Sequence, residues 1–147
     1  MRTITIILYF FFTIIFLASI GVTLPYVFDR ANADPNAIKN FNQNIVTYFI
    51  AILFSASLDY VMKLFDDQAS YRKMAILFVC IGDTAVLIMT CFILYYNSKG
   101  EIKGISGLAI LGIVAAYIMW WVANYKNSAF NINATLGGNA ERPLQNG

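Results

Sequence analysis

Four long apolar stretches, separated by short polar segments, dominate the pattern of this chain. The stretches cover residues 4–24, 45–64, 74–96 and 105–122. About twenty apolar residues in an α-helix are enough to cross the roughly 30 Å hydrocarbon core of a bilayer. A water-soluble chain of 147 residues has no use for four such stretches. The pattern therefore predicts an all-α membrane protein, a bundle of four transmembrane helices with antiparallel neighbours.

The polar segments divide the chain into one membrane domain, residues 1–126, and a polar tail, residues 127–147. Pro25 predicts the end of the first span, because proline disfavours a helical conformation in the residue before it. The longest connection, residues 26–44, is rich in asparagine and predicts a solvated loop, in which Pro35 can begin a short helix. Residues 97–104 form a short turn, so the last two spans should form an antiparallel hairpin.

Lysine and arginine counts predict the orientation, because cytoplasmic loops carry an excess of these residues. With the N-terminus inside, the inner side carries Arg2, Lys63, Arg72, Lys73, Lys126 and Arg142, and the outer side carries Arg30, Lys39, Lys99 and Lys103. The first apolar stretch exceeds the about 7–15 residues of a signal-peptide core, so we expect it to be retained. These features predict a multi-pass protein of a bacterial inner membrane with both termini, and hence the tail, in the cytoplasm.

Composition argues against several classes of function. Charged residues make up 12% of the chain, about half the share in a globular protein. The chain has no histidine, the commonest general base and metal ligand. A net charge of +2 is too small to indicate nucleic-acid binding. The sequence also has no spacing typical of a zinc site, a phosphate-binding loop or a nucleophile–base pair. We therefore expect no enzymatic activity, no catalytic residue, no cofactor and no metal.

Asp83 stands near the middle of the third predicted span. An ionisable group there costs about 2.5–3.5 kcal/mol on insertion, so it should avoid lipid. Helical spacing places it on one stripe with Ile76, Cys80, Leu87 and Thr90. One interpretation is a proton or cation site formed with Thr90, or a ring of carboxylates in an oligomeric pore. The other is a neutral Asp83 that hydrogen-bonds across helices, because a carboxyl group buried without a counter-charge tends to stay protonated.

Small residues cluster in the fourth span. Gly112 and Ala116 form a pair at four-residue spacing, which lets two helices approach closely. Together with Gly107 they are predicted to be packing residues, either within one protomer or between protomers. A bundle this small has little interior of its own, so we expect a homo-oligomer.

A charged segment joins the second and third spans on the predicted inner side. Its charged residues are Asp66, Asp67, Arg72 and Lys73. The segment is either a docking surface for a cytoplasmic protein partner or a solvated turn.

In length and span count the chain resembles the small four-span membrane subunits of bacterial anti-phage defence systems, such as the membrane component of Kiwa. The resemblance covers these two properties, and no functional residue is carried over from it. It implies a scaffold or sensor in the lipid bilayer that recruits a cytoplasmic partner. The competing functions are a small ion channel or a proton- or cation-coupled transporter built around Asp83, and a holin-like pore.

Overall fold

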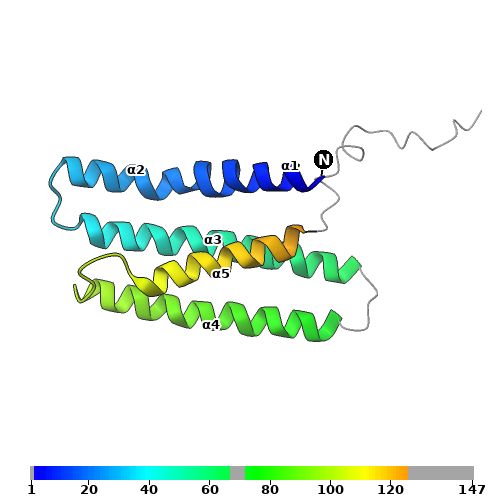
Figure 1. Ribbon diagram of the computed structural model, residues 1–147. Helices are drawn as coiled ribbons and strands as arrows, with labels where there is room; N and C mark the ends of the chain where they lie inside the picture. The colour runs from blue at the N-terminus through cyan, green and yellow to red at the C-terminus, as the bar shows by residue number, and fades with distance from the viewer. Residues whose placement is uncertain (1, 67–71, 126–147) are drawn as a thin grey trace, which may run out of the picture.

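The protein is described by a computed structural model, which places residues 2–66 and 72–125 (Figure 1). The first helical rod consists of α1 (Arg2–Tyr9), a π-helical segment η1 (Phe10–Leu17) and α2 (Ala18–Ala31), which follow one another without a break. The other helices are α3 (Ala37–Asp66), α4 (Arg72–Ser98) and α5 (Gly107–Asn124). Four helical spans within the described residues are long and apolar enough to cross a membrane, so the predicted all-α, four-span fold is confirmed.

Helix α3 is the centre of the bundle. It packs against α2, α4 and α5, and its contact with α5 is the most extensive. In Figure 1 the first rod, α3 and α4 run as three long, nearly parallel cylinders, and each successive helix reverses direction. The shorter α5 begins beside α4 at the hairpin and crosses α3 toward α1. Contact between α4 and α5 is correspondingly sparse.

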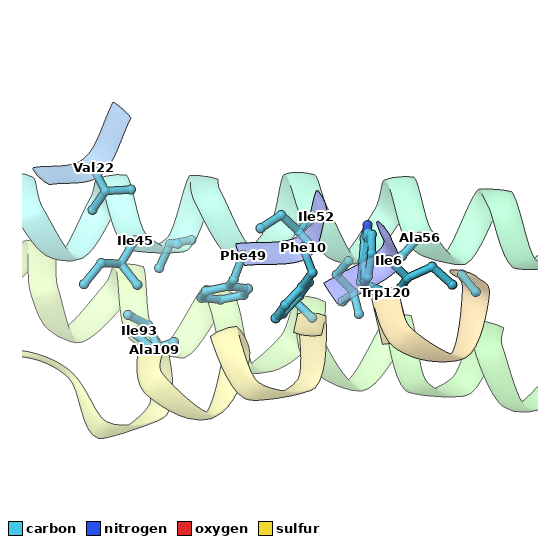
Figure 2. Packing of buried hydrophobic residues seen from close by; sticks show 14 residues of the cluster. Ile6, Phe10, Val22, Ile45, Phe49, Ile52, Ala56, Ile93, Ala109 and Trp120 are labelled. Atoms are coloured by element: carbon cyan, nitrogen blue, oxygen red, sulfur yellow. The ribbon is translucent and has the colours of Figure 1, made fainter. Parts of the chain in front are cut away.

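The seam between α3 and α5 is the tightest part of the core. Phe49 of α3 is 0% exposed, and Figure 2 shows its ring pointing toward α5. A Cβ added to Gly112 would lie 2.7 Å from that ring, and Ala109 and Ala116 beside it are also fully buried. Lipid is as apolar as a leucine side chain, so helices in a membrane associate through close van der Waals packing. The small residues of α5 provide that close approach.

An aromatic cluster joins the first rod to the end of α5. The ring centroid of Phe10 lies 4.9 Å from that of Trp120, 5.2 Å from that of Tyr117 and 5.3 Å from that of Trp121. Offset and edge-on arrangements of this kind are the favourable ones for aromatic pairs. This cluster fixes the position of η1 against α5.

Two tyrosines stabilise the π-helical segment. The Tyr48 hydroxyl donates to the carbonyl oxygen of Ile14 at 2.6 Å. The Tyr117 hydroxyl oxygen lies 2.8 Å from the Tyr48 hydroxyl oxygen. A hydroxyl has one proton, so Tyr117 must donate to Tyr48. In a π-helix each backbone carbonyl accepts from the N–H five residues ahead, instead of four residues ahead as in an α-helix. One carbonyl of this irregular turn is thus bound by a side chain of α3.

The first helix does not end at Pro25 as predicted; it continues to Ala31. Proline removes one backbone hydrogen bond, and contacts with α3 offset that loss. The ring centroids of Tyr26 and Phe41 lie 4.5 Å apart, and Asn40 Nδ2 donates to Asp29 Oδ2 at 3.0 Å. The connection is therefore much shorter than the predicted loop, and α3 begins at Ala37.

Two asparagines close the bundle at the hairpin end. Asn42 is 0% exposed; its Nδ2 donates to the Gly104 carbonyl at 2.9 Å and to Asn97 Oδ1 at 3.4 Å. Its Oδ1 accepts from the Ser106 backbone N–H at 3.1 Å, and Asn97 Nδ2 donates to the Lys39 carbonyl at 2.9 Å. The predicted hairpin is thus anchored on α3 through side-chain bonds.

Candidate functional site

A groove of about 570 Å³ lies between α4 and α5, in the half of the molecule where α4 begins and α5 ends. Figure 1 shows why it forms: α5 leaves α4 after the hairpin and crosses toward the first rod. Leu53 and Tyr60 of α3 contribute to its floor, Val79 and Val86 to one wall, and Met119 to the other. The groove is therefore a mostly apolar recess on the flank of the bundle.

Asp83 lies in the α4 wall of this groove. Ser57 of α3, itself 3% exposed, donates from Oγ to Asp83 Oδ1 at 2.9 Å. The Asp83 side chain remains partly exposed in spite of this contact. The bond joins two helices and is of the kind that the structural interpretation of Asp83 expects. Partial exposure in the groove also leaves the carboxyl group accessible to a ligand.

Thr90 does not join Asp83 in the groove. It lies two turns further along α4, is 5% exposed, and its Oγ1 has no hydrogen-bond partner within the described structure. Two turns of an α-helix advance about 11 Å. The structure therefore places the two candidate residues about two turns apart on α4, with Asp83 in the groove and Thr90 buried.

The buried face of α4 also differs from the predicted stripe. Leu87 is 42% exposed and Cys80 is exposed, whereas Val86 lines the groove and Ile93 and Asn97 are buried. Inward-facing positions recur with an average spacing near 3.5 residues, which is typical of helices that wind around one another in a left-handed sense. The predicted stripe has the same average spacing and shares Asp83 and Thr90 with the packed face, but it continues through positions 80 and 87 instead of 79 and 86. Which side of Asp83 is covered depends on where α3 packs against α4, and this is not visible in the local pattern.

The predicted packing residues of α5 separate into two groups. Gly112 and Ala116 lie inside the protomer: a Cβ added to Gly112 would meet Phe49 of α3, and Ala116 is 0% exposed. Gly107 is exposed, and a Cβ added there would meet nothing within 4 Å. Gly112 and Ala116 are thus packing residues within one protomer.

The charged segment between α3 and α4 lies only partly within the described residues. Asp67 lies outside the described residues, as does the tail of residues 127–147, and the Asp66 side chain is likewise not described. Arg72 folds back on the end of α3: its Nη1 donates to the Phe65 carbonyl at 3.3 Å, and its Cζ lies 5.8 Å from the Phe65 ring centroid. Lys73 is exposed. Arg72 therefore has a structural contact, and Lys73 presents an exposed surface charge.

Sequence reasoning missed Ser57 and the contact that Lys63 makes with α5. Ser57 supplies the donor for Asp83, and the Lys63 ammonium donates to the Ala123 carbonyl at the end of α5. A cation at a helix C-terminus is favourable because the carbonyl ends of the helix carry partial negative charge. Ser57 could have been suspected because a buried carboxyl group requires a hydrogen-bond donor. Ser55 was an equally good candidate for this donor, so the sequence alone did not distinguish the two serines.

Comparisons with known proteins add no identity to this geometry. No protein-family model, no curated protein and no solved structure matches the chain. Within residues 2–66 and 72–125, no three histidine, cysteine, aspartate or glutamate side chains come together in a way that could hold a metal ion. The features that bear on function are the groove, the packed core and the charged connection between α3 and α4.

Proposed function

We propose that this protein is a small scaffold or sensor subunit of a bacterial inner membrane, which forms a homo-oligomer and recruits a cytoplasmic protein. The filled interior of the bundle is the observation that carries this proposal. Phe49 is fully buried against Gly112, and Phe10 packs among three aromatic rings of α5. A protomer whose centre holds packed rings is suited to act as a rigid body that presents surfaces to partners.

The setting of this role rests on the resemblance to small four-span subunits of anti-phage defence systems, and it is part of the proposal. On the orientation that the basic residues favour, the α3–α4 connection and the tail face the cytoplasm. The exposed Lys73 at the start of α4 is the described charge best placed for docking there.

A small ion channel, an ion-coupled transporter or a holin-like pore is the alternative. Asp83 favours it, because this carboxyl group stays partly exposed in the groove although Ser57 binds one of its oxygens. An ion-linked role requires that the carboxyl group exchange a proton or bind a cation during function.

Asp83→Asn separates the two functions. Asparagine keeps the size of the side chain and an oxygen that accepts from Ser57, but it cannot ionise. For a scaffold we expect an unchanged oligomer and unchanged recruitment. Asp83→Leu should instead lower the free energy of unfolding by about 1–3 kcal/mol, because the Ser57 hydroxyl loses its acceptor. Native mass spectrometry, unfolding in detergent and ion flux into liposomes measure these effects. An ion flux carried by the wild type and lost in Asp83→Asn, with the oligomer intact, would replace the scaffold by an ion pathway.

Lys73→Glu tests recruitment. We expect this charge reversal to abolish co-purification of a cytoplasmic protein in mild detergent while membrane insertion stays normal. Lys99→Glu, at the opposite end of α4, is the matched control and should retain the partner, since Lys99 is also exposed. Arg72 is left unchanged because it binds the Phe65 carbonyl. Quantitative mass spectrometry of the purified complexes compares the three proteins. Equal recovery of the partner with both variants would contradict docking at this end of the bundle.

A further inference from the structure

The groove between α4 and α5 has the properties of a small-molecule site. Sites for ligands of drug size usually measure about 300–1,000 Å³ and are lined mainly by apolar side chains with a few polar groups. This groove measures about 570 Å³. Leu53, Val86 and Met119 are among its apolar lining residues, and Asp83 and Tyr60 contribute the polar atoms. Its size and composition therefore fit a compact apolar molecule with one polar end.

The Asp83 carboxyl group defines the polar end. Oδ1 accepts from Ser57 at 2.9 Å, while Oδ2 accepts from no group in the described part of the chain. A carboxylate oxygen at the edge of an apolar recess binds most strongly to a charged donor, because charge-assisted hydrogen bonds are about twice as strong as neutral ones. The group that completes this site should thus be a cation with a hydrogen to donate.

A second copy of the chain does not supply such a cation from its described residues. The lysines and arginines placed by the structure lie at or near the ends of the helices or in the connections. Lys63 is the one nearest the groove level on α3, and it already binds the Ala123 carbonyl. Among the residues that the structure describes, no cation is placed to complete the site, which favours a complementary charge on another molecule.

We propose that the groove binds a lipophilic amine, with the protonated nitrogen on Asp83 and the apolar part along the walls formed by α4 and α5. The groove lies on the flank of the bundle, between two helices that make little contact, so such a molecule can enter sideways from the bilayer. This site goes beyond the scaffold role, and binding is measured independently of partner recruitment.

Gly82 allows the groove to be filled without disturbing the protein. It lines the groove beside Asp83, and a Cβ added to it would meet nothing within 4 Å. Gly82→Leu should therefore place a side chain in the ligand space while the helices keep their positions. Replacing a helical glycine also favours the helix, so loss of binding in this variant would not reflect unfolding.

Dodecylamine and dodecanol are suitable probes, because they share a chain and differ in charge. Binding of each to the full-length protein in phosphatidylcholine nanodiscs is measured by equilibrium dialysis, with empty nanodiscs subtracted. We expect saturable binding of one dodecylamine per protomer. Asp83→Asn should weaken it about tenfold or more, and Gly82→Leu should weaken binding of both probes. Asp59→Asn, which removes an exposed carboxyl group elsewhere on α3, should bind dodecylamine as the wild type does.

Three results would overturn the proposal. Binding of dodecylamine no greater than to empty nanodiscs would exclude the site. An equal affinity of Asp83→Asn and the wild type would show that the carboxyl group does not hold the amine. Unchanged binding in Gly82→Leu would place the ligand outside the groove.

Discussion

Replacing Gly112 by leucine should destabilise the protomer by about 3 kcal/mol or more, since even modest overpacking of a tight core costs about 1–3 kcal/mol. The reason is the Phe49 ring, three of whose carbons would lie 2.7, 2.8 and 2.9 Å from the new Cβ. Phe49 is fully buried and cannot turn away without displacing its neighbours. Unfolding in mixed detergent, followed by circular dichroism, measures the change in free energy.

Gly107→Leu is the matched control, because it adds the same side chain to the same helix where nothing lies within 4 Å. We expect its stability to equal that of the wild type or exceed it slightly. Equal destabilisation by both variants would contradict the packing of α3 on α5.

Because Gly112 lies inside the protomer, Gly112→Leu reports on folding and not on the oligomer. The oligomer is tested by native mass spectrometry of the wild type. A clean monomer across detergents would contradict the proposed homo-oligomer.

Asn42→Leu should produce the second large effect, a loss of about 2–4 kcal/mol, because a buried polar group left without a partner costs about 1–3 kcal/mol. Three groups lose their partner: Asn97 Oδ1, the Gly104 carbonyl and the Ser106 N–H. The connection between α4 and α5 should also exchange its amide hydrogens faster. Hydrogen exchange with mass spectrometry and unfolding in detergent measure both effects.

Asn44→Leu serves as the control for Asn42→Leu. Asn44 lies on the same turn of α3, is partly exposed, and makes no side-chain hydrogen bond within the described residues. We expect little change in stability and no faster exchange in residues 99–106. If Asn44→Leu loosened the hairpin as much as Asn42→Leu does, the anchoring role of Asn42 would be wrong.

Local sequence patterns predicted the four helical spans but not the point at which the first helix ends. Apolar length alone identifies four spans, because the thickness of a bilayer sets the length of a helix that crosses it. The continuation past Pro25 depends on Tyr26 and Asp29 contacting α3. Such contacts join residues far apart in the chain, and they are not visible in the local pattern.

The candidate site was predictable in its central residue only. Asp83 could be singled out, because a carboxyl group in the middle of an apolar stretch is rare and costly. Its donor Ser57 lies 26 residues earlier, on another helix. The groove depends on the direction that α5 takes after the hairpin, which Asn42, Gly112 and the aromatic cluster around Phe10 set together. No single segment of the sequence encodes that direction.

The π-helical segment η1 sets the rotation of α1 about its own axis relative to α2. Because each bond in η1 spans one residue more than in an α-helix, reverting this segment to α-helical winding would rotate α1 about its own axis relative to α2. Phe10 would then turn away from Trp120 and Tyr117. The hydrogen bond from Tyr48 to the Ile14 carbonyl opposes this rotation, because it holds η1 in its π-helical conformation. The direction in which the exposed aromatic side chains of α1 and η1 point into the bilayer thus depends on the Tyr48 hydroxyl group together with the packing of Phe10 against α5.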